Sequence, residues 1–344
     1  MESTDQQEGG VTNAPTTPGN EMLAVLQDTY GPAGVLRMAT IARPEVGVDD
    51  VLVRVQAATV HMGDWHLMTG QPYLMRILGF GLRRPKQRVR GSDVAGTVEA
   101  VGGNVTAFKG GDEVFGTCDG AYAEFATARE KTLAPKPGQV SFAEAASVPT
   151  SGCTALQALR AGGVAPGQRV LVIGASGGVG MFAVQLAKSY GAEVTGVCSA
   201  AKVDLVRSLG ADHVLAYDRE DFSSDGQRYD LIVVLAGNRS LTQLRRSLKH
   251  KGSLVLVGGE DGGHWIGAAM VRSLRALVLS PFVSQQLRMV AATVTQDDLE
   301  VLRELLATAR IRPVIDRTYP LSRAPEAIGY LHAGHARGKL VITA

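Results

Sequence analysis

The sequence predicts an α/β protein of two domains, one rich in β-strands and one built on a doubly wound parallel sheet. The chain has 344 residues, which at roughly 100 to 200 residues per domain is enough for two separate cores. Up to about Leu133, short β-branched runs alternate with glycine and proline. After Gly152, apolar strands alternate with helices of about ten to twelve residues, which indicates a parallel sheet covered on both faces.

The composition is that of a globular protein. Hydrophobic residues make up 45% of the chain and charged residues 20%, and the 41 glycines follow no collagen-like period. Because 35 Lys and Arg oppose 33 Asp and Glu, the net charge of +2 offers no bulk attraction for a polyanion, and we expect no nucleic-acid partner. The spacing of Cys118, Cys153 and Cys198 fits neither a disulfide framework nor a structural zinc site, which favours a reducing, cytoplasmic location.

Two stretches bear on export and on membranes. Residues 1–21 contain no Lys or Arg and no apolar core, so they predict a disordered tail and not a secretory signal or transit peptide. The uncharged run 170–187 approaches the length of a membrane span, but its clustered glycines indicate a turn. We therefore expect no membrane partner.

The elements follow from the pattern of apolar residues. Segments 52–60 and 94–102 predict strands in the first domain, and the Pro-, Gly- and Ser-containing stretch 133–152 predicts the interdomain connection. In the second domain, strands are expected at 170–174, 194–198, 213–217, 231–237 and 254–259, with helices between them. The remainder predicts a helix at 297–310 and a strand at 339–343.

A glycine-rich loop, GASGGVG at 174–180, lies between the first of these strands and an apolar helix. In this context Gly177 would let the backbone approach a pyrophosphate, Gly180 would let the helix pack on the sheet, and the helix N-terminus would supply N–H donors. The alternative is a purely structural turn. The strand and helix alternation that follows favours a dinucleotide site.

The second strand bears on the choice of cofactor. An NAD site places an acidic residue at the carboxyl end of this strand. Glu193 has nearly the right spacing but precedes the strand, whereas Ser199 and Lys202 follow it and suit a 2′-phosphate. NADPH is therefore the predicted cofactor. The alternative is that Ser199 caps the next helix and that Lys202 is solvated.

Six motifs in order resemble the medium-chain dehydrogenase/reductase superfamily, and specifically its zinc-free quinone oxidoreductase branch. They are GSDVAGTVEAVGGNVTAFKGGDEVFG, GAYAEFA, AASVPTSGCTALQAL, GASGGVG, LGADHVLAY and GHARGKLVIT. The resemblance implies a GroES-like substrate domain at 22–148, completed by 288–344, around a Rossmann NADPH-binding domain at 149–287. It also implies a homodimer through the Rossmann sheet.

The resemblance carries cofactor roles onto residues of this chain. Its phosphate loop matches Gly177, Gly178 and Val179, its 2′-phosphate positions match Ser199, Lys202 and Tyr217, and a terminal RGK matches Arg337, Gly338 and Lys339. For this last trio, a basic loop before a strand is the equal alternative. The full predicted cofactor set is Ser176, Gly177, Gly178, Val179, Ser199, Lys202, Tyr217, Gly258, Phe282, Val283, Arg337, Gly338 and Lys339.

No metal is expected. Zinc-dependent relatives supply a cysteine, the histidine of GHE and a second cysteine, but this chain has Ser92 within GSD and Thr150 at the later position, so that only His61 can ligate. A catalytic zinc normally needs three protein ligands. Without a Lewis acid, the expected reaction is hydride transfer to an already polarised quinone or α,β-unsaturated carbonyl.

The predicted catalytic residues are His61, Asp64 and Tyr73. His61 stands where the family usually has Asn and could act as donor or general acid; Asp64 matches an acidic position, and Tyr73 could present a phenol. His66 lies where zinc-dependent relatives keep a proton-relay histidine. The alternative is that Asp64 caps a helix while Tyr73 and His66 are packing residues.

The basic segment is typical of a solvated loop, although it could also rim the cleft and favour anionic acceptors. Its members are Arg76, Arg83, Arg84, Lys86, Arg88 and Arg90. Three functions remain open: a general NADPH-dependent quinone or enone reductase, a pathway-specific reductase of a biosynthetic intermediate, and a non-catalytic NADPH-binding interaction protein.

Overall fold

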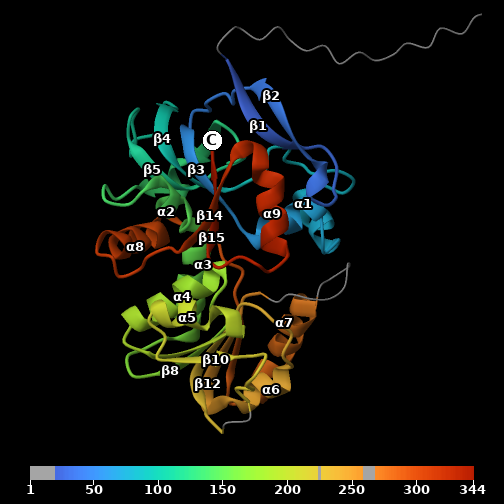
Figure 1. Cartoon of the computed structure of the whole chain (residues 1–344), viewed down its shortest axis with the longest axis vertical. Coiled ribbons are helices and arrows are strands. Elements are labelled where there is room, and N and C mark those ends of the chain that lie inside the picture. The colour runs from blue at the N-terminus through green and yellow to red at the C-terminus, as the bar shows by residue number, and fades with distance from the viewer. Residues whose placement is uncertain (1–19, 224–225, 259–267) are drawn as a thin grey trace, which may run out of the picture.

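The computed structural model describes residues 20–223, 226–258 and 268–344. Figure 1 shows two lobes stacked along the long axis of the molecule. One lobe contains the beginning and the end of the chain, and the other contains its middle. α3 (Pro149–Gly162) lies between them and contacts strands of both lobes.

A mixed sheet forms the first lobe. Its order is β14-β15-β3-β4-β5-β7, and β6 pairs with β3 off this path. β3 (Asp50–Val60) lies at its centre, antiparallel both to β15 and to β4, so the end of the chain joins the sheet begun by the N-terminal part. The other strands are β4 (Asp93–Val101), β5 (Glu113–Thr117), β6 (Phe125–Arg129), β7 (Leu133–Pro135), β14 (Ile315–Pro320) and β15 (Lys339–Thr343).

Smaller elements surround this sheet. β1 (Glu21–Gln27) and β2 (Leu36–Ala42) form a two-stranded sheet of their own, and α1 (Met62–Thr69) contacts α9 (Ala324–His332). α2 (Phe142–Ala146) packs on β3 and β4, and α8 (Gln296–Ala307) packs on β7 and α3.

The second lobe contains a parallel sheet of order β10-β9-β8-β11-β12-β13. Its strands are β8 (Arg169–Ile173), β9 (Glu193–Cys198), β10 (His213–Ala216), β11 (Tyr229–Val234), β12 (Leu248–Leu256) and β13 (Gln286–Met289). Successive residues of β8 face opposite sides: Val170 and Val172 join the core with α4 (Gly178–Ser189), and Leu171 and Ile173 join the core with α6 (Leu241–Arg246) and α7 (Ala268–Leu279). Both faces are therefore buried, and the predicted fold class is confirmed.

Several boundaries differ from the predictions. β1 begins at Glu21, so this residue belongs to a strand and not to the predicted tail, whose residues 1–19 lie outside the described part of the chain. β13 extends to Met289, past the predicted domain limit of 287. α5 (Val203–Ser208) is shorter than expected because Gly210, at φ +96°, turns the chain toward β10. Within the described residues, no helix is both long and apolar enough to cross a membrane.

Candidate active site

The glycine loop follows β8 and begins α4, with Gly177 as the N-cap. A Cβ on Gly180 would lie 2.1 Å from the carbonyl oxygen of Gly174, so only glycine allows the helix to begin this close to the strand. Gly174 itself has φ +88°, a conformation that favours glycine. The first N–H groups of α4 consequently point out of the carboxyl edge of the sheet, where they can receive an anion.

Other predicted cofactor residues lie at the same edge. Ser199 follows β9, and Tyr217 follows β10 with its side chain 58% exposed. Gly258 follows β12, and a Cβ there would lie 2.9 Å from the carbonyl oxygen of Leu235. Arg272 of α7 donates to the carbonyl oxygens of Gly237, Arg239 and Gly258, and thereby holds the loops that follow β11 and β12.

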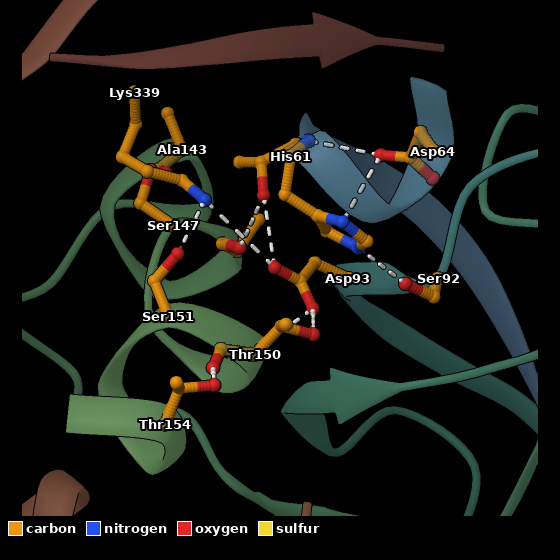
Figure 2. A network of polar contacts seen from close by, with 12 residues as sticks. His61, Asp64, Ser92, Asp93, Ala143, Ser147, Thr150, Ser151, Thr154 and Lys339 are labelled. Atoms are coloured by element: carbon orange, nitrogen blue, oxygen red, sulfur yellow. Dashed lines mark hydrogen bonds and ion pairs between the residues drawn. The ribbon is translucent and has the colours of Figure 1, made fainter. Parts of the chain in front are cut away.

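Lys339 is the predicted cofactor residue that the structure buries most deeply. Its side chain is 2% exposed, and Nζ donates to Ser151 Oγ at 3.0 Å and lies 3.9 Å from Asp93 Oδ2 (Figure 2). A Cβ on Gly178 would lie 4.0 Å from this Nζ. Burial lowers the pKa of Lys339, and the Asp93 carboxylate opposes that shift. A buried ammonium group thus lies beside the positive end of α4, an arrangement that an anion between them would stabilise.

Asp93, at the start of β4, lies between Lys339 of β15 and Thr150 of α3. Its fully buried carboxylate accepts from Thr59 Oγ1 at 3.2 Å and from the backbone N–H of Thr150 at 3.1 Å, and it also accepts from the Thr150 hydroxyl. The buried charge of this carboxylate is therefore balanced by hydroxyl and backbone donors and by the nearby Lys339.

His61 directly follows β3 and is the N-cap of α1. Its Nε2 lies 2.8 Å from Ser92 Oγ, and its Nδ1 lies 3.7 Å from Asp64 Oδ2, as Figure 2 shows. Asp64, at the third helical position, accepts from the backbone N–H of His61 at 2.9 Å. Asp64 does cap the helix, as one alternative held, and it also faces the imidazole.

Two buried groups support Asp64 from behind. Tyr122 is fully buried, and its hydroxyl donates to Asp64 Oδ2 at 2.9 Å. Burial, together with the negative charge of Asp64, raises the pKa of Tyr122 well above its usual value, so the phenol remains a donor. Arg90 is 4% exposed, and burial lowers its pKa while Asp64 opposes the shift.

Lys202, one of the residues predicted to bind the 2′-phosphate, contacts the loop that precedes β15. Lys202 Nζ donates to the carbonyl oxygen of Gly334 at 3.1 Å, which brings the terminal loop to the edge of the second lobe. In that loop Arg337 is exposed, and a Cβ on Gly338 would lie 2.4 Å from the carbonyl oxygen of Val314. Asp218 accepts from the N–H of Ala200 at 3.0 Å, so a carboxylate from the next strand also reaches this turn.

Phe282 and Val283 do not lie at this edge. They precede β13, which runs parallel to β12, and Ser284 Oγ donates to the carbonyl oxygen of His250 near the start of β12. Both residues are thus at the amino end of the sheet, opposite the glycine loop, and this position contradicts the prediction that they bind the cofactor. The error came from matching a sequence stretch without knowing that a helix separates it from the end of β12.

Tyr73 and His66 are held by local packing. The guanidinium carbon of Arg76 lies 4.6 Å from the centre of the Tyr73 ring, and His66 Nδ1 lies 2.9 Å from the carbonyl oxygen of Gln71. The basic segment is divided: Arg83, Arg84 and Lys86 are exposed, Arg88 pairs with Asp28 at 2.5 Å, and Arg90 is buried behind Asp64. Arg76 and Arg90 are therefore structural, and the rest fits a solvated surface.

The side chains around His61 do not form a suitable set of zinc ligands. Its neighbours are the Ser92 hydroxyl and the Asp64 carboxylate, which is already occupied by a tyrosine and a backbone N–H. Across the described ranges, no group of three or more His, Cys, Asp and Glu side chains is placed to hold a metal ion. Burial also raises the pKa of the Cys153 thiol to about 12, which disfavours the thiolate that a metal would need.

No binding or catalytic role was predicted from the sequence for five residues of this site: Ser92, Asp93, Tyr122, Ser151 and Arg272. The first four lie in the motifs GSDVAG, GAYAEFA and VPTSG. In each motif polar residues stand among small and apolar ones, and that pattern was the signal that could have pointed to them. Arg272 lies on an amphipathic helix and carries no such signal.

Comparisons with known proteins agree on one family. The model for the alcohol dehydrogenase GroES-like domain matches residues 47–158, and that for zinc-binding dehydrogenase matches residues 209–342. A chloroplast envelope quinone oxidoreductase homolog of Arabidopsis thaliana is 32% identical over 94% of this chain and 99% of its own. A chloroplastic NADPH-dependent alkenal/one oxidoreductase of the same plant is 32% identical over 94% of this chain and 79% of its own. The solved quinone oxidoreductase of Coxiella burnetii superposes with a TM-score of 0.84 at 30% identity, covering 94% and 99% of the two chains.

Proposed function

Because the chain belongs to the medium-chain dehydrogenase/reductase superfamily, in its quinone oxidoreductase-like branch, and is an NAD(P)H-dependent oxidoreductase, we propose that it reduces a quinone or an α,β-unsaturated carbonyl with NADPH and without zinc. The observation that carries the proposal is the polar network of Figure 2, in which Asp93 links the buried Lys339 beside the glycine loop to the segment that holds His61. Cofactor and acceptor would therefore be bound by adjoining parts of one network.

The residues present fit a dinucleotide. Gly177 and Gly178 leave the space beside the α4 N-terminus free of side chains, and Lys339 supplies a buried positive charge there. In this proposal Ser176, Val179 and Gly258 would complete the cofactor site at the same edge, while Ser199, Lys202, Tyr217 and Arg337 would surround a 2′-phosphate. When bound, the cofactor supplies the hydride. The NADPH choice rests on Ser199 and Lys202 and remains the specific part of the proposal.

His61 is the proposed donor to the acceptor. Its ring is 14% exposed and is held on both sides by side chains. An imidazolium fixed in this way would stabilise the negative charge that develops on the acceptor oxygen and would supply its proton. Asp64 holds the ring, whereas Tyr73 is assigned only a place in the wall of the site.

The test is anaerobic oxidation of NADPH against a panel of quinones, enones and aldehydes, with His61→Ala and His61→Asn alongside. We expect turnover with quinones or enones and a loss of roughly 10²- to 10³-fold in kcat for His61→Ala. Metal analysis of the active protein should show no stoichiometric zinc. Tight NADPH binding with no turnover on any acceptor would favour a non-catalytic binding protein, and turnover confined to one intermediate would favour a pathway-specific reductase.

We also propose a homodimer through the second lobe. β13 is the terminal strand of its sheet, and the neighbouring helix α7 and the turn after it expose Leu274, Val278 and Phe282, the last at 81%. An open strand edge beside an apolar surface suits an identical partner. Sedimentation velocity should give a dimer that Phe282→Arg weakens. The proposed location is cytoplasmic, and cell fractionation tests it.

A further inference from the structure

We propose that Ser92 is the residue that passes the proton from His61 to the acceptor oxygen, so that Ser92, His61 and Asp64 form a proton relay. This inference rests on the proposed function and names a catalytic residue for it. None of the sequence motifs assigned Ser92 a role.

The two ring nitrogens of His61 have different neighbours. Nε2 lies 2.8 Å from Ser92 Oγ, within hydrogen-bond distance, and Nδ1 faces the Asp64 carboxylate at 3.7 Å. In the proposed relay, the neutral ring carries its proton on Nδ1, toward the Asp64 carboxylate, and Nε2 accepts from the serine hydroxyl. The order serine, Nε2, Nδ1, aspartate is the order in which serine, histidine and aspartate exchange a proton in hydrolase triads.

The charged and titratable groups around the ring are few. Asp64 faces it from α1, with Tyr122 and Arg90 behind that carboxylate, and Asp93 adjoins Ser92 on β4 with Lys339 of β15 beyond it. Asp64 carries the negative charge nearest to the ring, 3.7 Å from Nδ1.

Accessibility changes along the chain of hydrogen bonds. Tyr122 and Asp64 are buried, at 0% and 2% exposed, whereas His61 and Ser92 are partly exposed. A proton relay needs one end that the acceptor can reach and an imidazole ring that solvent can reprotonate. The open end of this chain is Ser92 with His61.

The step balances as follows. Hydride adds to the electrophilic carbon of the acceptor, and the electron pair of the conjugated system moves onto the acceptor oxygen. The Ser92 O–H bond breaks as its proton goes to that oxygen, and Ser92 Oγ takes the proton of His61 Nε2 at the same time. His61 is left neutral, with its remaining proton on Nδ1 facing Asp64, and solvent restores the second proton.

The experiment compares Ser92→Ala, Ser92→Thr and Ser147→Ala. Ser147 is the control serine from the same part of the fold, because its hydroxyl donates at 2.8 Å to the helix carbonyl of Ala143 and not to His61. The measurements are kcat against pH in H₂O and D₂O, and the ¹⁵N chemical shifts of the His61 ring during a pH titration of the cofactor-free protein.

We expect Ser92→Ala to lower kcat by roughly 10²-fold and to reduce the solvent isotope effect, because the relayed proton is lost. Ser92→Thr should restore most of the rate, and Ser147→Ala should match the wild type. In the cofactor-free protein, the Nε2 shift should move in Ser92→Ala and the Nδ1 shift should not.

Wild-type turnover with an unchanged rate and isotope effect in Ser92→Ala would overturn the relay and leave the proposed function intact. A wild-type protein that reduces no acceptor would contradict the proposed function, and the relay with it. A ring whose neutral form carries its proton on Nε2 would also overturn the relay, whatever the turnover.

Discussion

The edge of the parallel sheet and the group around His61 are built in different ways. At the edge, the backbone shapes the site: Gly174 and Gly180 bring a strand end and a helix N-terminus together, and Lys339 adds a buried positive charge beside them. Around His61, side chains form the site. They come from His61 itself just after β3, from Asp64 of α1, from Ser92 just before β4 and from the loop that contains Tyr122. A Cβ added at one of these glycines should therefore disrupt the first site, and the loss of one side-chain hydrogen bond should disrupt the second.

The largest effect should follow Gly180→Ala. A Cβ there would meet the carbonyl oxygen of Gly174 at 2.1 Å, and because both partners are backbone, α4 must move away from β8. We expect the free energy of unfolding to fall by roughly 3 kcal/mol and NADPH affinity to fall with it. Denaturant unfolding and fluorescence titration with NADPH measure the two effects.

Gly329→Ala is the matched control, because this glycine also lies in a helix, α9, but has no atom within 4 Å of an added Cβ. Its stability should stay the same or rise by about 0.5 to 1 kcal/mol. Equal losses in the two variants would show that the close approach of α4 to β8 is not what makes Gly180 necessary.

The sequence predicted the backbone site far better than the side-chain site. A glycine cluster between an apolar strand and an apolar helix is a local signal, so the loop at 174–180 and the alternation of strands with helices along the chain could be anticipated. Ser92, Asp93 and Tyr122 reach His61 and Lys339 only through the pairing of β3 with β4 and β15. Such long-range contacts leave no periodic signal. Phe282 shows the opposite error, because it was predicted for the site and lies away from it. Its position follows from the direction of β13, which runs parallel to β12 and begins after Phe282.

Removing one hydrogen bond from the side-chain site should have an intermediate effect. Tyr122→Phe leaves the buried Asp64 with one donor fewer, which should lower the free energy of unfolding by about 2 kcal/mol at pH 8. The difference should depend on pH. The pKa of Tyr122 is raised in the folded protein, so its contribution is complete below pH 10 and declines above it, as the unfolded chain loses a proton that the folded one keeps.

Denaturant unfolding of both proteins at pH 8 and at pH 10.5 checks this. The gap between wild type and Tyr122→Phe should narrow at the higher pH. A gap that stays constant or widens would mean that the phenol is not the donor that holds Asp64.

The smallest expected effect distinguishes the roles of two lysines at the cofactor edge. Lys339 lies beside the N-terminus of α4, where a dinucleotide would place phosphate oxygens that NADH and NADPH share. Lys202 follows β9, where only NADPH would place its 2′-phosphate. Lys339→Met should therefore weaken both cofactors by about tenfold, and Lys202→Ala should weaken NADPH by about tenfold and leave NADH nearly unchanged. Affinities of both cofactors for the two variants measure this. Equal wild-type affinity for NADH and NADPH, unaltered by Lys202→Ala, would refute the 2′-phosphate assignment and turn attention to Asp218, whose carboxylate at the same turn suits ribose hydroxyls.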